Sequence, residues 1–176
     1  MPPSDPTPSH QSPVTSHAKA SHQSPVTSHS KRIAGIDYGT VRIGIALADT
    51  EVRIASPFEN YNRRTPALDA EYFKQLATEE RVDRFVVGLP VHLSGAESQK
   101  SQEARAFGQW LNEATGVPVA FFDERFTTSE PDDLLGAAKL TKKQRQARRD
   151  QLAAQIMLTA YLESGARGQI EPGGIE

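Results

Sequence analysis

The 176-residue chain contains no cysteine, which excludes disulfide bonds, thiolate metal sites and a cysteine nucleophile. It also lacks any run of about 18 apolar residues, the length that a membrane-spanning helix requires. Its first residues show neither the apolar segment of a secretory signal nor the arginine-rich pattern of a transit peptide. A net charge of −2 provides no overall attraction for nucleic acid. These absences predict a soluble cytoplasmic protein.

The first thirty residues differ in composition from the rest of the chain. They hold six of the twelve prolines and four of the five histidines, but no glycine. The segment SHQSPVTSH occurs at 9–17 and again at 21–29. So few apolar residues cannot offset the entropy lost on ordering, and we predict a disordered low-complexity tail over 1–30, with metal binding by its histidines as the alternative.

The remaining residues predict one folded domain over 31–168, large enough for a hydrophobic core, and a flexible tail over 169–176. Apolar periodicity and turn residues predict three strands first, and then helices that alternate with further strands. This order predicts an α/β fold with a mixed five-stranded sheet and helices on both faces. The expected strands are a hairpin over 32–48 with its turn at 38–42, followed by 54–58, 84–89 and 117–122; the expected helices are 65–80, 97–115, 127–140 and 148–164.

Acidic residues occur at the ends of predicted strands and at the start of the last predicted helix. Asp37 ends the first strand of the hairpin, Asp123 and Glu124 follow an apolar strand, and Asp150 lies on the apolar face of the last helix. Together they would form an oxygen-rich site for Mg²⁺ or Mn²⁺, which can activate water against a phosphodiester. Structural interpretations remain open: Asp37 as a turn residue, Asp123 as a partner of Arg125, and Asp150 as a helix-capping acid.

Charges of one sign are grouped in the second half of the chain. Six basic residues and no acid lie between Lys139 and Arg149, and five acids lie between Asp123 and Asp133. A basic stretch beside an acidic cluster would suit a polyanion held next to a metal site. A solvated helix face is the alternative interpretation of the basic stretch.

Four motifs in order resemble the YqgF/RuvX family: IDYGTVRIGIALAD at 36–49, VVGLPVHLSGAES at 86–98, FDERFTT at 122–128 and DQLAAQIMLTAYL at 150–162. That family comprises Holliday junction resolvase-like proteins, also described as nucleases that mature pre-16S rRNA. The resemblance extends over residues 32–165. It implies a ribonuclease H-like fold and hydrolysis of phosphodiester bonds by carboxylate-bound Mg²⁺ or Mn²⁺.

The resemblance also implies roles for individual residues. Asp37 and Asp150 match the family's catalytic metal ligands, and Glu124 is the expected third ligand. Asp123 is the alternative, because a shift of one residue along a strand reverses the direction of a side chain. Residues with expected nucleic-acid contacts are Arg42, Arg125, Thr127 and Thr128, and in the basic stretch Lys142, Lys143 and Arg145. Arg149 departs from the family pattern, which usually has an apolar residue before the last-helix acid.

The expected function is nuclease processing of the 5′ end of pre-16S rRNA in ribosome biogenesis. The expected partners are pre-rRNA or branched DNA, with association with ribosome precursors and a monomeric or homodimeric state. One alternative is a resolvase of Holliday junctions or other branched DNA, and another is a non-catalytic nucleic-acid-binding factor. The D-x-G-T segment at 37–40 also resembles a phosphate loop of actin-like ATPases and sugar kinases, but those proteins need a second related domain.

Overall fold

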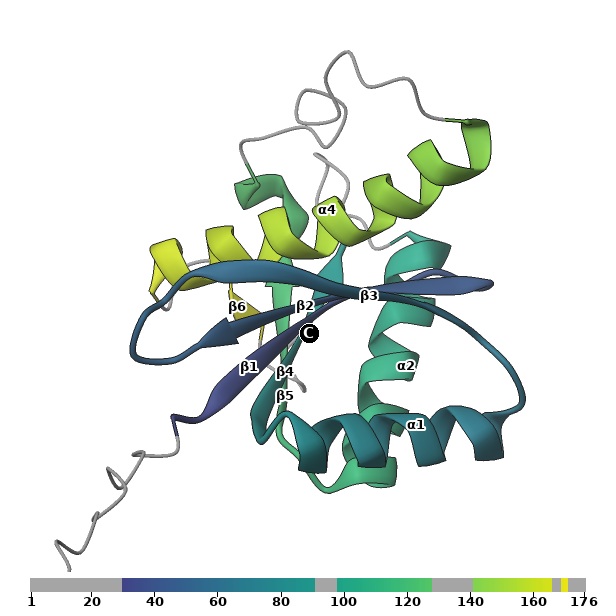
Figure 1. The fold of residues 1–176 in the computed structure, drawn as a ribbon, viewed down its shortest axis with the longest axis horizontal. Helices are drawn as coiled ribbons and strands as arrows, with labels where there is room; N and C mark the ends of the chain where they lie inside the picture. Colours follow the sequence, from purple (N-terminus) through teal and green to yellow (C-terminus); the bar gives the residue numbers. More distant parts are fainter. Residues whose placement is uncertain (1–29, 91–97, 128–140, 166–168, 171–176) are drawn as a thin grey trace, which may run out of the picture.

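A single mixed β-sheet lies between two layers of helices in the computed structural model (Figure 1). The structure describes residues 30–90, 98–127, 141–165 and 169–170. In these residues the sheet has six strands in the order β3-β2-β1-β4-β5-β6. The predicted α/β fold, a mixed sheet with helices on both faces, is therefore confirmed.

The first three strands form an antiparallel meander, and the next two run parallel to the first. Residues Arg32–Asp37 form β1 and Arg42–Asp49 form β2, with the turn where the hairpin was predicted. Strand β4, Val82–Leu89, is parallel to β1, and β5, Val119–Asp123, is parallel to β4. The carboxyl ends of β1, β4 and β5 consequently meet at one edge of the sheet, where ligands bind in such folds.

Strand β3, Ala55–Asn62, extends beyond the strand predicted at 54–58 and contains Pro57. Ile45 of β2 pairs with Glu59, and Ala46 pairs with Pro57, so Phe58 forms a bulge between them. Among the described strands β3 has β2 as its one neighbour. An edge strand tolerates proline because one side of its backbone makes no ladder hydrogen bonds.

A sixth strand, β6, was not predicted. Gln169–Ile170 pairs with Phe121 and Phe122 of β5 in antiparallel register. These two residues had been assigned to a flexible tail over 169–176, and that assignment is wrong for them, because β5 provides free backbone groups at the sheet edge. Residues 171–176, and all but Ser30 of the predicted tail over 1–30, lie outside the described residues.

Helices α1 and α2 cover one face of the sheet, and α4 covers the other (Figure 1). Helix α1, Pro66–Glu79, begins after Thr65, whose hydroxyl accepts a hydrogen bond from Leu68 N. Helix α2, Gln99–Thr115, ends at Gly116, which has a left-handed backbone with φ 72°. A short 3-10 turn, Glu124–Phe126, follows β5. The remainder of the helix predicted at 127–140 lies outside the described residues beyond Thr127.

Helix α4, Lys142–Ser164, begins earlier than the predicted start at 148. Its first turn is closed by a capping box in which Thr141 and Gln144 satisfy each other's backbone N–H groups. The basic residues that follow are good helix formers, so the helix continues through them. Asp150 therefore lies within the helix and does not open it. This position excludes the interpretation of Asp150 as an N-cap or first-turn acid.

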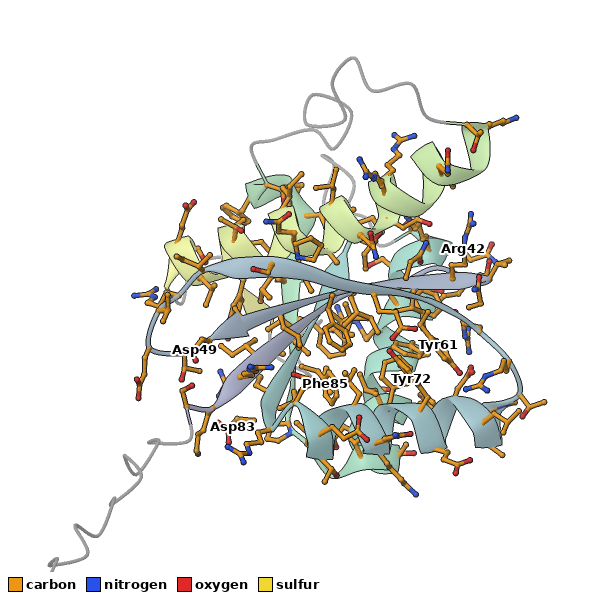
Figure 2. The ribbon with its side chains drawn as sticks, viewed as in Figure 1. Arg42, Asp49, Tyr61, Tyr72, Asp83 and Phe85 are labelled. Carbon is orange, nitrogen blue, oxygen red and sulfur yellow. The ribbon has the colours of Figure 1, made fainter. Side chains whose placement is uncertain are left out.

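Apolar side chains form a core on each face of the sheet. Phe73, Phe85 and Phe121 pack between the sheet and the α1–α2 layer, where Figure 2 shows Phe85. Val86 and Leu158 belong to the second core, between the sheet and α4. Successive residues of β4 thus point to opposite faces, which explains its continuous apolar run. In the part of the chain that the structure describes, no helix has the length and apolarity to span a bilayer.

Candidate active site

Three acidic side chains from distant parts of the sequence line one cavity at the carboxyl edge of the parallel strands. Asp37 is the last residue of β1, Glu124 follows the last residue of β5, and Asp150 comes from α4. The cavity has a volume of about 390 Å³. Its other polar lining residues are Lys100, Thr127, Gln146 and Arg149. The structure therefore brings together the three acids that were the first expectation from the sequence.

Two glycines create the space for this arrangement. A Cβ atom on Gly44 of β2 would lie 2.1 Å from the backbone oxygen of Asp150, so a side chain there would push α4 away. A Cβ atom on Gly88 of β4 would lie 2.5 Å from Oε1 of Glu124. The glycines in the motifs at 36–49 and 86–98 thus allow a helix and a carboxylate to approach the sheet closely.

Asp37 is the acid with the most perturbed titration. The pKa of Asp37 is raised to about 7. Burial is the largest cause, the negative charge of Glu124 and then that of Asp150 act in the same direction, and Lys100 opposes them. Burial also raises the pKa of Glu124, where Lys100 again acts in the opposite direction and Asp123 adds to the increase. The two acids share an environment that disfavours their negative charges, and a bound cation would relieve it.

Asp150 is held by three donors from three elements. Nδ2 of Asn60 in β3 lies 3.4 Å from Oδ2 of Asp150, and Nε2 of Gln146 lies 2.8 Å from Oδ1. Nε of Arg42 in β2 lies 3.5 Å from the same Oδ2 atom. These contacts orient the carboxylate toward the hairpin, and Arg42 is already part of this site before any nucleic acid binds.

Asp123, the alternative ligand, has a structural role. Its side chain is 5% exposed and accepts hydrogen bonds from the backbone N and from Nε of Arg125, at 2.9 and 3.0 Å to Oδ1. Nη2 of Arg125 completes the pair with a contact of 2.5 Å to Oδ2. Asp123 does not line the carboxylate cavity. The contacts of Asp123 are therefore those expected of a partner of Arg125.

The other residues with expected nucleic-acid contacts are placed differently. Thr127 lines the cavity, and its buried Oγ1 has no hydrogen-bond partner among the described residues. Lys142 is exposed at the start of α4, away from the cavity lining. Thr128 lies outside the described residues, as do the side chains of Lys143 and Arg145.

Sequence reasoning missed Lys100, Gln146 and Arg149 as members of the site. Lys100 is the second residue of α2, where the helix dipole disfavours a positive charge. That unfavourable position could have indicated a site residue, because a lysine in the first turn of a helix is more readily explained by acidic side chains near it in the fold. Arg149 had been noted only as a departure from the family pattern, and it lines the cavity beside Asp150.

The donor set fits a divalent cation in its chemistry. Carboxylate oxygens are the ligands that Mg²⁺ and Mn²⁺ prefer, and mutual repulsion among these acids favours a cation between them. Within the described ranges, however, no three His, Asp or Glu side chains lie close enough together to hold one ion. Coordination by all three acids would therefore require their side chains to move toward one another.

Comparisons with known proteins agree with the motifs. A family model described as "RuvX: Holliday junction resolvase" matches residues 31–164. A relative from Rhodopirellula baltica is 48% identical over 133 residues, which cover 76% of this chain and 77% of the relative. Relatives from Anaeromyxobacter sp. strain K and Koribacter versatilis are 38% and 34% identical, over 77% and 80% of this chain and 98% and 92% of theirs. All three carry the name "Putative pre-16S rRNA nuclease".

A solved structure with the same fold is T. thermophilus RuvC in complex with a Holliday junction substrate. The TM-score is 0.53 at 16% identity, and the match covers 80% of this chain and 99% of that one. This similarity supports the fold alone, and it confirms the predicted ribonuclease H-like architecture.

Proposed function

Because the chain belongs to the RuvX family, we propose that it is a divalent-metal-dependent nuclease that processes the 5′ end of pre-16S rRNA. The family prediction made from the four motifs is confirmed by the match over 31–164. The observation that carries the proposal is the convergence of Asp37, Glu124 and Asp150 on one cavity. Acids from three separate elements would rarely share a cavity unless their charges were used.

In this proposal Asp37, Glu124 and Asp150 hold Mg²⁺ or Mn²⁺. Such an ion supplies activation of water and stabilisation of the leaving oxygen of a phosphodiester. Asp37 must lose its proton to act as a ligand, and its pKa of about 7 means that protonation competes with ion binding near neutral pH. The contacts from Arg42, Asn60 and Gln146 hold the Asp150 carboxylate in a defined orientation.

Positive charge in and around the cavity supports an anionic substrate. Lys100 and Arg149 line the carboxylate cavity, and Arg42 lines an adjoining cavity. We expect these three side chains to contact phosphate groups on either side of the scissile bond. Thr127 provides a hydroxyl without a partner among the described residues and is placed to donate a hydrogen bond to a phosphate oxygen.

The names of the relatives support pre-16S rRNA as the substrate, and such a substrate implies a cytoplasmic location and contact with ribosome precursors. The description of the family model supports branched DNA as the second candidate. Symmetric cleavage of a junction requires a dimer, because two strands must be cut. A protein that stays monomeric when bound to a junction would therefore argue against that candidate.

The test measures Mn²⁺-dependent cleavage of a structured rRNA precursor by the wild type, Asp37→Asn and Asp150→Asn. Both substitutions should reduce the rate by more than the ~10–100-fold that loss of a supporting residue typically costs. Asp83→Asn is the matched control. Asp83 lies near the start of β4, at the opposite end of the strand from the site, and pairs with Lys31 at the surface (Figure 2). Equal activity of all four proteins would contradict the proposal. RNA binding without cleavage by the wild type would favour a non-catalytic binding factor.

A further inference from the structure

A second cavity with an aromatic lining lies beside the carboxylate cavity. It has a volume of about 300 Å³, and Tyr38, Phe107 and Trp110 contribute rings to its lining. The ring centroids of Tyr38 and Phe107 are 5.0 Å apart with an interplanar angle of 33°, and those of Phe107 and Trp110 are 5.4 Å apart at 36°. The three rings therefore form a row in which neighbouring rings are tilted relative to each other. Phe107 is buried, whereas Tyr38 and Trp110 are partly exposed.

The aromatic cavity is connected to the carboxylate site through shared residues. A third cavity of about 240 Å³ lies between the two and shares Asp37, Lys100 and Asp150 with the carboxylate cavity. It shares Tyr38, the residue that follows Asp37, with the aromatic cavity. Helix α2 borders this path from Lys100 to Trp110, a distance of ~15 Å along its axis. An extended strand could therefore occupy all three cavities at once.

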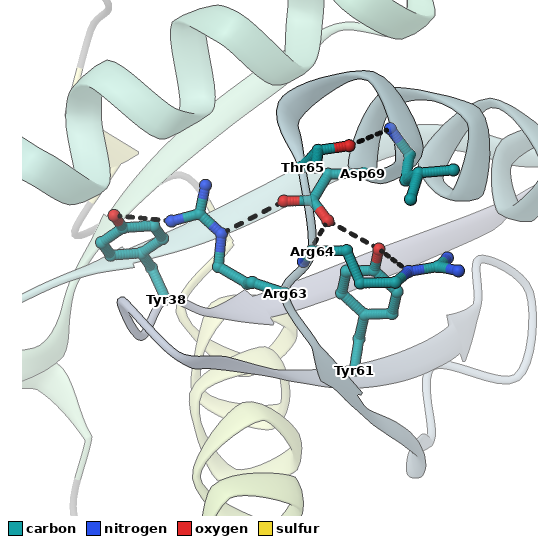
Figure 3. Close-up of polar contacts among 7 residues, drawn as sticks. Tyr38, Tyr61, Arg63, Arg64, Thr65 and Asp69 are labelled. Carbon is teal, nitrogen blue, oxygen red and sulfur yellow. Dashed lines mark hydrogen bonds and ion pairs between the residues drawn. The ribbon is translucent and has the colours of Figure 1, made fainter.

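Arg63 lies beside Tyr38 and is held there by a network centred on the buried Asp69 (Figure 3). Its guanidinium carbon is 5.5 Å from the ring centroid of Tyr38 and 5.6 Å from that of Phe107. Nη1 donates to the Tyr38 hydroxyl at 3.1 Å, and Nε lies 3.4 Å from Oδ2 of Asp69. Asp69 is fully buried and also accepts a hydrogen bond of 2.6 Å from the Tyr61 hydroxyl. The cation and the ring beneath it are thus fixed before a ligand arrives, which lowers the entropy lost on binding.

We propose that this aromatic cavity binds one unpaired nucleobase of the substrate strand, next to the phosphate held at the carboxylate site. The inference rests on the proposed function and adds a subsite to it. Every nucleobase has a π-face, so stacking on Tyr38 and Trp110 would be tolerant of sequence. Arg63 suits both a base and its phosphate, because a guanidinium stacks on rings and pairs with phosphate oxygens. A base within a duplex has both faces covered by its neighbours and cannot use this subsite.

The test measures binding apart from cleavage, in the Asp150→Asn background, by fluorescence anisotropy of a labelled single-stranded RNA. An abasic nucleotide is placed at each position of the oligonucleotide in turn, so that the base is removed without any change to the protein. We expect one position, or two adjacent ones, to weaken binding by about 5- to 150-fold, the factor equivalent to the stacking of one base. In the Trp110→Leu variant the abasic substitution at that position should have less than about a twofold effect.

Two further variants separate stacking from a general loss of structure. Trp110→Phe retains a ring and should restore most of the affinity of Trp110→Leu. Phe58→Leu removes a ring that is 40% exposed at a different cavity, and it should leave the abasic profile unchanged. Fully paired RNA should bind equally well to the parent and to Trp110→Leu.

Several outcomes would overturn the proposal. A flat abasic profile would show that no base is bound, and equal weakening of single-stranded and paired RNA by Trp110→Leu would show a purely structural role. An aromatic cavity that binds an apolar peptide in place of RNA would give the flat profile too. Failure of the nuclease proposal has a different signature, because the wild type would then show the position-dependent profile without cleavage in Mn²⁺.

Discussion

Gly88 and Glu124 approach each other so closely that a Cβ atom on Gly88 would lie 2.5 Å from Oε1 of Glu124. Gly88 pairs with Phe122 across β4 and β5, two residues before Glu124 in the sequence. The absence of a side chain on one strand therefore provides the space for an acid that leaves the end of the next. This contact connects the motif at 86–98 with the motif at 122–128.

Gly88→Ala should reduce nuclease activity while the protein still folds. The added methyl group meets the end of a flexible side chain, so Glu124 moves and the cost in stability is ~1–3 kcal/mol. We expect a rate loss of ~10–100-fold. Activity and thermal unfolding should be measured for Gly88→Ala, Glu124→Gln and the double variant, whose losses should be less than additive because both act through one carboxylate.

Gly116→Ala is the matched control for that prediction. Gly116 has φ 72° and nothing within 4 Å of the position of a Cβ atom, so alanine there adds backbone strain without a clash. We expect a loss of ~1 kcal/mol in unfolding free energy with unchanged activity of the folded protein. Full activity of Gly88→Ala would contradict the proposed use of Glu124.

The raised pKa of Asp37 predicts how stability depends on pH in the metal-free protein. Between the ordinary value of 3.8 and about 7 the unfolded chain has lost this proton and the folded chain retains it, so the folded state is destabilised as pH rises and the effect levels off above about 7. Asp37→Asn removes this dependence. Relative to the wild type, the unfolding free energy of Asp37→Asn should rise by up to ~4 kcal/mol between pH 4 and pH 8, measured by urea unfolding with a chelator present. Parallel pH curves for the two proteins would contradict the burial of this acid.

Lys100→Met should move the acidic limb of the pH–activity profile toward higher pH. The ammonium of Lys100 lowers the pKa of both Asp37 and Glu124, so its removal makes these acids harder to ionise. At pH 6 the Mn²⁺-dependent rate should fall several-fold more than at pH 8. Lys74→Met, on the exposed surface of α1, should keep the wild-type midpoint. A uniform loss at all pH values would indicate a phosphate contact without an effect on the acids.

Asp69→Asn should destabilise the fold, and the pH dependence of this effect should be opposite to the one predicted for the Asp37 carboxyl group. Burial raises the pKa of Asp69, but hydrogen bonds from Tyr61, Arg64 N and Arg63 outweigh burial and hold it below its usual range. Its contribution is therefore present above about pH 4 and is lost as the carboxylate protonates at lower pH. We expect a loss of ~3 kcal/mol at pH 7 and a smaller loss at pH 3. Asp83→Asn, which breaks a surface pair, should cost no more than ~0.5 kcal/mol at pH 7, so a loss of that size for Asp69→Asn would contradict the network.

Local signals in the sequence were sufficient for most elements. Helix α1 begins after Thr65 with Pro66 in its first turn, and α2 ends at Gly116, because caps and left-handed residues act within one helical turn. The start of α4 was placed too late, because a basic stretch gives no apolar periodicity. Strand β6 has two residues and no signal of its own, since it depends on the edge of β5.

The candidate site likewise has residues that local sequence signals indicate and residues that depend on tertiary neighbours. Asp37, Glu124 and Asp150 could be selected because each stands at the end of a strand or on an apolar helix face, and the four motifs fixed the family to which they belong. Asp123 remained the alternative to Glu124 as the third ligand, because adjacent residues at the end of a strand differ only in the direction in which their side chains point. In the tertiary structure Asp123 pairs with Arg125, whereas Glu124 lines the cavity, and this geometry supports the proposal that Glu124 is the ligand.

The sequence by itself determined the α/β order of elements and the family, and it singled out the three acids proposed as ligands, because these depend on residue types and short-range spacing. Only the tertiary structure decided that Lys100, Gln146 and Arg149 join these acids, and that an aromatic cavity containing Tyr38, Arg63 and Trp110 adjoins them. Such neighbours come from different elements, and their distances depend on how α2 and α4 pack on the sheet. No spacing along the chain records that packing.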